Sequence, residues 1–365
     1  MYCITNITKR QQCFKVALVG ISEDYMKNFV GIFIFLFCVN LFVPVLYYQI
    51  YYNSNLQDIS QLLTELPQDI STFENPYSSS SSIYKQGDTY DLYNLATQEL
   101  CSIDRISFLV GSAACEMPAS YEEEAIKAQM IACHSYYIYC QQNGVPSEDM
   151  NLSFDERYMT KYASKQRLQE YWGMSFNEYY EKFLRCAKEI SDLIVTYDNS
   201  AALTSYFAVS CGKTQTSQAE WGTALPYLDC VDSANDALSG DYLKVKTFSV
   251  QDTYDRLMTY FTGFELDRDN PQNWFGDILY NKSGYVDTIE VSDIKITGRE
   301  FRNCFQLHSA CFMIFYENGE FSIATKGYGH GVGLSQFGAN SMASEGKNYT
   351  EILKHYFPNT SLTKI

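Results

Sequence analysis

The sequence is short of basic residues. Its 365 residues include 27 Lys and Arg against 43 Asp and Glu, which gives a formal net charge of −16. No segment gathers Lys and Arg into a basic face. Because a nucleic-acid binder must neutralise phosphates with a concentrated basic surface, this composition excludes a general nucleic-acid-binding function.

Charged residues of either sign are also few, at 19%, whereas 46% of the residues are hydrophobic. This balance excludes wholesale disorder. The length suffices for two ordinary domains or for one large domain with appendages. The 31 tyrosines are compatible with surfaces that stack on sugars, although aromatic packing in a core is the commoner reason for such a content.

The sequence contains no Cys-x-x-Cys pair and no regular cysteine spacing. Nine of the twelve cysteines follow residue 50, at positions 101, 115, 133, 140, 186, 211, 230, 304 and 311. An odd number in a chain of this size favours free, buried thiols at least as much as a disulfide framework. Zinc is a third alternative, through Cys133, His134 and Cys140 with Cys211, but no recognised ligand spacing supports it.

One long segment lacks charge altogether. Residues 29–50 are almost entirely apolar, and about 20 such residues suffice for a helix to cross a bilayer. Basic residues precede this segment, and none occurs from Gln49 to Tyr84, so the positive-inside rule predicts a cytoplasmic tail at 1–28 and an extracytoplasmic remainder. A cleaved signal peptide or a buried core helix is the alternative, but the segment is long for the former and lacks a small-residue cleavage site.

The Asn-, Gln- and Ser-rich residues 51–88 predict a stalk or linker. An outer domain is therefore expected at 89–365. Within it, residues 89–114 read as short strands that lead into a turn. A helix is predicted from Tyr121 to Gln142, with a capping box formed by Ser120 and Glu123 and a stop at Asn143-Gly144.

Small residues mark one face of that helix, and they predict close packing against another element. These residues are Ala125, Ala128, Ala132 and Ser135. Glu116 precedes the helix, in a segment predicted to be non-helical, where a carboxylate can be half-buried at the lip of a groove.

The rest of the outer domain alternates between helix and strand signals. A helical region is predicted at 165–192, a β-hairpin that turns at Asp198-Asn199, and a short helix near 250–262. Strands are expected in 287–298 and 311–327, followed by a Gly-rich loop that leads into helices. The predicted fold is α+β, with mixed small sheets and helices around a substrate cleft, preceded by one N-terminal transmembrane helix.

Four blocks of the outer domain resemble motifs of the stage II sporulation protein D family. They occur along the chain in the same order as in that family. The first block is EMPASYEEEAIKAQMIA at 116–132 and the second is SCGKTQTSQAEWGTALPYLDCVDS at 210–233. The third is TGREFRNCFQLHSACFMI at 297–314, and the fourth, GYGHGVGLSQFGANSMASEGKNYTEILKHYF at 327–357, contains a Gly-His-Gly-Val-Gly signature. The resemblance covers about 90–365.

The resemblance implies that Glu116 is the catalytic acid/base of a lytic transglycosylase. Cleavage of the bond between N-acetylmuramic acid and N-acetylglucosamine requires an acid, and the apolar neighbours Cys115, Met117 and Pro118 suit a carboxyl group of raised pKa. In such an enzyme the 6-hydroxyl of muramic acid attacks, so one carboxylate suffices, and no paired-carboxylate constellation stands out here. The alternative is a loop carboxylate bonded to the N–H groups of the following helix.

The resemblance also indicates a substrate groove lined by residues near 116, 210–221 and 330. His330, between two glycines, can bond a sugar or instead hold two loops together as a turn histidine. The other expected substrate-binding residues are His134, Tyr206, Ser210, Lys213, Thr214 and Trp221.

Several positions depart from the family pattern. His134 stands where Arg is frequent, Phe207 where His is frequent, and Cys211 where Gly or Ser is common. Some family members have a Cys/His cluster after the first helix that can hold zinc, but residues 143–170 contain neither residue type. No metal site is carried over, and no cofactor is expected.

Function divides into three hypotheses. The first is a membrane-anchored lytic transglycosylase that acts during spore engulfment on glycan strands lacking stem peptides, with stage II sporulation proteins P and M as partners by resemblance. The second is a non-catalytic wall-binding enhancer of an N-acetylmuramoyl-L-alanine amidase. The third is a structural wall-binding protein in which Glu116 is replaceable.

Overall fold

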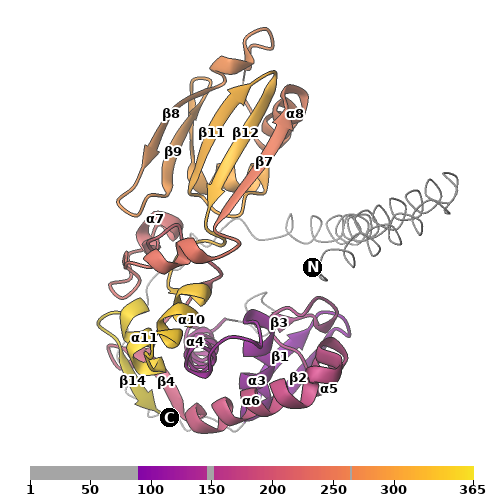
Figure 1. The fold of residues 1–365 in the computed structure, drawn as a ribbon, viewed down its shortest axis with the longest axis vertical. Coiled ribbons are helices and arrows are strands. Elements are labelled where there is room, and N and C mark those ends of the chain that lie inside the picture. The colour runs from indigo at the N-terminus through magenta and orange to yellow at the C-terminus, as the bar shows by residue number, and fades with distance from the viewer. Residues whose placement is uncertain (1–88, 146–151, 264) are drawn as a thin grey trace, which may run out of the picture. The chain divides into compact units, whose positions relative to one another are not determined.

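The computed structural model describes residues 89–145, 152–263 and 265–365 (Figure 1). No helix within these ranges is both long enough and apolar enough to cross a membrane. The predicted tail at 1–28, anchor at 29–50 and stalk at 51–88 lie outside the described residues.

The fold is α+β, with several small sheets and helices, as the sequence predicts. The sheets have the strand orders β2-β1-β3, β14-β4-β5, β13-β6, β10-β9-β8 and β11-β12-β7. The strands are β1 (Thr89–Asn94), β2 (Glu99–Asp104), β3 (Ser153–Phe154), β4 (Leu193–Tyr197), β5 (Ser200–Ala201), β6 (Tyr206–Phe207), β7 (Leu243–Ser249), β8 (Phe275–Tyr280), β9 (Val286–Val291), β10 (Ile294–Thr297), β11 (Phe312–Glu317), β12 (Glu320–Lys326), β13 (Leu334–Ser335) and β14 (Ser361–Lys364).

The helices of the described ranges are α3 (Arg105–Glu116), α4 (Glu123–Gln142), α5 (Lys165–Trp172), α6 (Phe176–Ile190), α7 (Ser217–Trp221), α8 (Val250–Tyr260), α9 (Gly298–Phe305), α10 (Gln336–Ser344) and α11 (Tyr349–Tyr356). Four short 3₁₀ turns lie between them, at Glu156–Tyr158, Gly173–Ser175, Ala234–Leu238 and Pro271–Asn273. The helical region predicted at 165–192, the short helix near 250–262 and the helices after the Gly-rich loop are thereby confirmed.

Helix α4 lies at the centre of the first hydrophobic core, in contact with α3, α6, α10, α11 and β4 (Figure 1). Its small-residue face is fully buried, as predicted. The Oγ of Ser135 accepts a hydrogen bond of 2.7 Å from the backbone N–H of Val195 on β4, and the carbonyl of Ala132 accepts one from Thr204. In each contact one short side chain bridges α4 and the neighbouring backbone, so the residues at the contact must be small.

The two ends of α4 differ in how well the sequence predicts them. The capping box at Ser120 is wrong, because the helix begins at Glu123 and its N-cap is Glu122, whose side chain makes no capping bond. The backbone N–H of Glu122 donates instead to the side chain of Asn340 on α10, at 2.8 Å. The stop at Asn143-Gly144 is confirmed, with Gly144 at a φ of 68°.

Residues 105–114 form a helix rather than the strand and turn predicted for them. Asp104 caps α3 by accepting a hydrogen bond of 3.0 Å from the N–H of Ser107. Residues 108–114 are all buried, and the small ones among them let α3 pack closely against neighbouring elements. Glu116 is therefore the last residue of a helix, and it does not lie in a non-helical lead-in.

A second hydrophobic core lies between the sheets β10-β9-β8 and β11-β12-β7, with α8 and α9 packed against them (Figure 1). A capping box of Thr297 and Glu300 begins α9, which buries Phe301 and Phe305. The strands predicted in 287–298 and 311–327 are confirmed. The predicted hairpin is confirmed as well, with Asp198 and Asn199 at positive φ, as a two-residue turn requires.

Gly111 provides a test of the packing of α3. A Cβ atom at this position would lie 2.3 Å from the carbonyl oxygen of Ala163 and 2.5 Å from the ring of Tyr162. We expect Gly111→Ala to lower the free energy of unfolding by about 1–3 kcal/mol, because overpacking forces neighbouring groups to shift. Urea unfolding measures the change. Gly240→Ala is the matched control, since a Cβ there meets no atom within 4 Å, and equal losses in the two variants would contradict the argument.

Candidate active site

Glu116 is half-buried at the C-terminal end of α3. Burial raises the pKa of its carboxyl group above the ordinary value. The positive charge of Lys161 and hydrogen bonds from the side chains of Gln336 and Tyr206 oppose that rise, but burial prevails. A carboxyl group in this setting keeps its proton to a higher pH than an exposed glutamate does. Once the proton has left, the hydrogen bonds from Gln336 and Tyr206 stabilise the carboxylate.

The donors around Glu116 belong to a network of polar side chains from α4, β6 and α10. The thiol of Cys133 donates to the hydroxyl oxygen of Tyr206 at 3.6 Å, and the Nε2 of Gln129 donates to the Cys133 sulfur at 3.3 Å. Gln336 donates in turn to Gln129 at 3.5 Å. Because burial also raises the pKa of the Cys133 thiol to about 12 and that of Tyr206 well above its usual range, both stay neutral beside Glu116 at neutral pH.

His330 holds two chain segments together. Its Nδ1 accepts a hydrogen bond of 3.0 Å from the N–H of Val332, and the ring also bonds the backbone of Tyr206. Burial lowers the pKa of His330 to about 3, so the ring is neutral. Phe207 and Trp221 pack on it, with ring centroids at 5.7 and 5.6 Å. This geometry favours the turn-histidine alternative over a direct bond to a sugar.

The glycines on either side of His330 and beyond it allow this approach. Gly331 has a φ of 83°, and a Cβ on it would lie 2.4 Å from the hydroxyl oxygen of Tyr285. Gly333 has a φ of 85°, and a Cβ on it would lie 2.1 Å from the carbonyl oxygen of Ser205. Both glycines therefore adopt backbone conformations that residues with a Cβ rarely take.

Ser210 and Thr214 are fully buried and bond within the protein. The N–H of Ser210 donates to the carboxylate of Asp236 at 2.6 Å, and the hydroxyl of Thr214 donates to the carbonyl oxygen of Asp229 at 3.1 Å. These contacts fix the shape of the 210–214 loop. Neither side chain presents surface to a ligand.

His134, expected among the substrate-binding residues, is fully buried in the first core. Its Nδ1 donates to the carbonyl oxygen of Leu193 at 2.9 Å, and its Nε2 accepts from the hydroxyl of Tyr90. Burial lowers the pKa of His134 to about 3. With both nitrogens engaged and no exposed surface, His134 supports β1 and β4 and does not reach a glycan.

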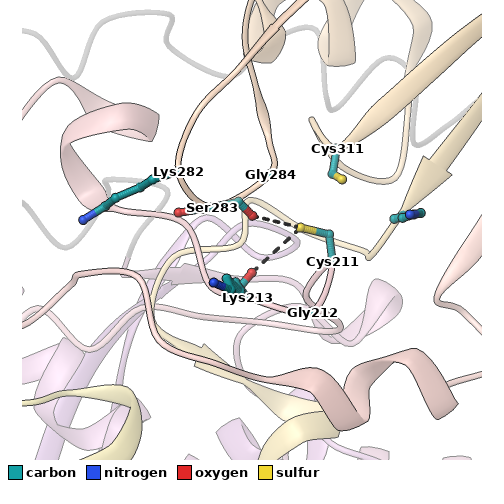
Figure 2. A pocket seen from close by; sticks show the side chains of 8 residues that line it. Cys211, Gly212, Lys213, Lys282, Ser283, Gly284 and Cys311 are labelled. Carbon is teal, nitrogen blue, oxygen red and sulfur yellow. Dashed lines mark hydrogen bonds between the residues drawn. The ribbon is translucent and has the colours of Figure 1, made fainter.

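Trp221 is half-buried at the end of α7, facing His330. Lys213 is exposed, and its Nζ lies 3.8 Å from the carboxylate of Asp232. It lines an open pocket of about 380 Å³ that contains none of Glu116, Tyr206 or His330 (Figure 2). The structure thus brings together Glu116, Tyr206, Trp221 and His330, and it separates Lys213, Ser210, Thr214 and His134 from direct roles at that cluster.

Sequence reasoning missed several polar residues near the cluster. Gln129 and Cys133 lie four apart on one face of α4, a spacing that the sequence contains, and Gln336 follows the Gly-rich signature. Glu220 is a further buried carboxyl group, close to Arg302 and Arg299, and burial raises its pKa to about 7. That Gln129, Cys133 and Gln336 gather near Glu116 becomes visible only from the packing of helices that are distant in sequence.

Metal ligands do not converge within the ranges that the structure covers. No group of three or more His, Cys, Asp and Glu side chains there could hold a metal ion. Cys133 faces Gln129 and Tyr206, whereas the adjacent His134 faces Tyr90 and Leu193. The nine cysteines from Cys101 to Cys311 are free thiols.

Comparisons with known proteins find both a matching family model and relatives that cover much of the chain. A family model described as stage II sporulation protein matches residues 94–197. Stage II sporulation protein D of Bacillus amyloliquefaciens and that of Bacillus subtilis are each 32% identical to the chain over 276 residues, which is 75% of this chain and 78% of each relative. The amidase enhancer of Bacillus subtilis is 24% identical over 306 residues, covering 68% of this chain and 39% of that protein.

The buried histidine His134 predicts a loss of stability in acid. Its pKa of about 3 in the folded state lies below that of a histidine in the unfolded state. As the pH falls, the unfolded state therefore binds a proton that the folded state does not, and the unfolded state is stabilised relative to the folded one. Between pH 7 and pH 5 we expect this residue to cost about 2 kcal/mol of the free energy of unfolding. Burial raises the pKa of Glu116, which acts in the opposite sense, so the test compares variants.

Urea unfolding of wild type and His134→Gln at the two pH values isolates the effect. The variant should lose about 2 kcal/mol less than wild type on acidification, because glutamine does not titrate. Parallel losses in wild type and His134→Gln would show that His134 is not held neutral.

Proposed function

Since the chain belongs to the stage II sporulation protein D family, we propose that it cleaves the glycan strands of peptidoglycan as a lytic transglycosylase. The observation that carries this proposal is the setting of Glu116. Its carboxyl group has a raised pKa through burial, and neutral donors from β6 and α10 reach it. These are the properties that a general acid needs when it must also act as a base within one reaction.

The reaction needs one carboxyl group in two successive roles. Protonated Glu116 donates its proton to the glycosidic oxygen as the bond from C1 of N-acetylmuramic acid to N-acetylglucosamine breaks. The carboxylate then accepts the proton of the 6-hydroxyl of the same muramic acid while that oxygen bonds to C1. The products are a free N-acetylglucosamine hydroxyl and a 1,6-anhydro end, no water is consumed, and Glu116 is protonated again.

Tyr206 and Gln336 contribute while Glu116 is ionised, between its donation of a proton and its recovery of one. Both donate hydrogen bonds to the Glu116 side chain, and such bonds favour the ionised form. They therefore stabilise the carboxylate that exists between proton donation and proton return. His330 holds the backbone of Tyr206, which makes it a positioning residue in this scheme.

The biological setting is proposed from the family and from the sequence outside the described ranges. Residues 29–50 would anchor the protein in the cell membrane with its C-terminal domain extracytoplasmic. The substrates would be glycan strands that lack stem peptides, in the wall that is remodelled during spore engulfment. Stage II sporulation proteins P and M are the proposed partners.

A second candidate function is a non-catalytic enhancer of an N-acetylmuramoyl-L-alanine amidase. The similarity to the Bacillus subtilis amidase enhancer favours it. So do His134 and Phe207, which stand where the family pattern differs and which are both buried here. Retention of Glu116 with a raised pKa favours catalysis.

Glu116→Gln tests the catalytic proposal with a nearly isosteric change. The full-length chain, purified in mild detergent, is incubated with peptide-free glycan strands, and mass spectrometry follows 1,6-anhydro-muramic ends. We expect the variant to lose about 10²–10⁴-fold in rate, because an amide cannot transfer the proton. Glu99→Gln, on the exposed strand β2, is the matched control and should cleave as wild type does.

The same preparation separates the two candidate functions. If wild type and Glu116→Gln both leave the strands intact, yet both bind them and accelerate an amidase, the enhancer is the correct assignment. Cleavage at the wild-type rate by Glu116→Gln would remove Glu116 from the mechanism.

Tyr206→Phe tests the tuning of Glu116. The Tyr206 hydroxyl lowers the pKa of Glu116 by donating to its carboxylate, so its removal should raise that pKa further. As a general acid loses activity above its pKa, the basic limb of the kcat/KM profile should move to higher pH. Tyr206→Leu, which lacks the ring as well, separates the hydroxyl from the packing. An unchanged limb in Tyr206→Phe would refute the hydrogen bond's effect.

A further inference from the structure

Two cysteine side chains enter one pocket from distant segments of the chain. Cys211 belongs to the loop before Lys213, and Cys311 immediately precedes β11; both line the open pocket of about 380 Å³ (Figure 2). They also pack in one small cluster with Tyr285 and Ala310. Cys211 is half-buried, and its thiol donates to the carbonyl oxygen of Ser283 at 3.4 Å. Because the pocket that Cys211 lines is open to solvent, a reagent can reach this residue.

The pocket is also the meeting point of three lysines in a chain of net charge −16. Lys213, Lys282 and Lys326 all line it. Lys282 pairs with Asp229 at 2.7 Å and Lys213 approaches Asp232 at 3.8 Å, and both of these pairs are exposed to solvent. The charge of Lys326 opposes the rise in the pKa of Cys311 and so favours the thiolate, the nucleophilic form of cysteine, at that residue.

The two sulfurs influence one another directly. A hydrogen bond from the Cys311 thiol lowers the pKa of Cys211, and the same contact raises the pKa of Cys311. The roles of the two residues follow from their exposure, because Cys211 is half-buried at the pocket whereas Cys311 is buried. The hydrogen bond to the Cys211 sulfur is the largest cause of the raised pKa of Cys311, ahead of burial, and the Cys211 thiolate is consumed once its sulfur is bonded to another sulfur.

We propose that Cys211 and Cys311 are a redox modification site, at which a small-molecule disulfide converts the two thiols into an intramolecular disulfide. The Cys211 thiolate attacks one sulfur of the reagent and displaces one thiolate, which leaves a mixed disulfide at Cys211. Cys311 then loses its proton, attacks the Cys211 sulfur and displaces the second thiolate. Two protein thiols are oxidised, and the reagent is reduced to two thiols.

Closure would join two parts of the molecule that meet at this pocket. Cys211 follows Ser210, which is bonded to Asp236 beside the first core, and Cys311 lies at the start of a strand that borders the second core. The bond would fix the backbone at Lys213 against β11. This inference concerns thiol chemistry and holds or fails independently of glycan cleavage.

The test uses the full-length chain in mild detergent with oxidised glutathione at neutral pH. After denaturation, iodoacetamide labels the remaining thiols, and mass spectrometry of the digest identifies linked peptides, with fragmentation to separate Cys311 from Cys304. We expect a Cys211–Cys311 link as the main product. In native protein without glutathione, iodoacetamide should label Cys211 at least ~10-fold faster than the buried Cys186.

Variants assign the two roles. Cys311→Ser should retain one glutathione on Cys211, because the resolving thiol is missing, and Cys211→Ser should give neither adduct nor link. Cys304→Ser, which removes a buried thiol of α9, should form the link as wild type does. Full labelling of both cysteines in wild type after glutathione treatment, or a dominant link to the nearby half-buried Cys230, would overturn the proposal.

Discussion

The carboxyl group of Glu116 lies where burial makes a negative charge costly, and the surrounding elements supply hydrogen-bond donors that reduce this cost. A buried carboxylate needs hydrogen-bond donors, or it keeps its proton. Here α3 delivers the group to the edge of the first core, β6 brings the Tyr206 hydroxyl, and α10 brings the Gln336 amide. The pKa of Glu116 is therefore raised, so the group keeps its proton to a higher pH than an exposed glutamate does. Its ionised form still has hydrogen-bond donors.

The supporting elements are short, and they depend on one another. β6 and β13 are two residues each and pair in parallel, so their own hydrogen bonds contribute little stability. The His330 ring strengthens this junction by bonding the backbone of both Tyr206 and Val332. Asp236 completes it, because its carboxylate accepts bonds from Ser210 and from the side chain of Ser335 at the start of α10.

Local signals in the sequence predicted local structure well. The hairpin at Asp198-Asn199 and the stop at Asn143-Gly144 depend on residues that tolerate positive φ, and both are present. Helix α3 departs from the prediction because its apolar run reads equally well as a strand, and its close packing at Gly111 against Tyr162 and Ala163 involves residues remote in sequence. The start of α4 departs from the prediction because its N-cap, Glu122, makes no side-chain capping bond and its N–H donates to Asn340 on another helix.

The candidate site shows the same division. Glu116 could be located from its motif, but its donors Gln336 and Tyr206 come from remote segments, and no spacing rule joins them. The family resemblance places His134 on the groove, whereas the helix turns its side chain toward Tyr90 in the core. Sequence position identifies a motif; burial decides which of its side chains meet solvent.

The long sequence separation inside the polar network has a consequence for the order of folding. Gln129 and Gln336 are bonded although they lie 207 positions apart. Closing so large a loop costs chain entropy, and the contact stabilises the protein only after the loop has closed. Such contacts therefore form late in folding. A chain that emerges N-terminus first therefore presents α3 and its glutamate well before α10 can dock. Glu116 acquires its tuned acidity only when the C-terminal helices are in place, which makes the completed fold a precondition for the chemistry.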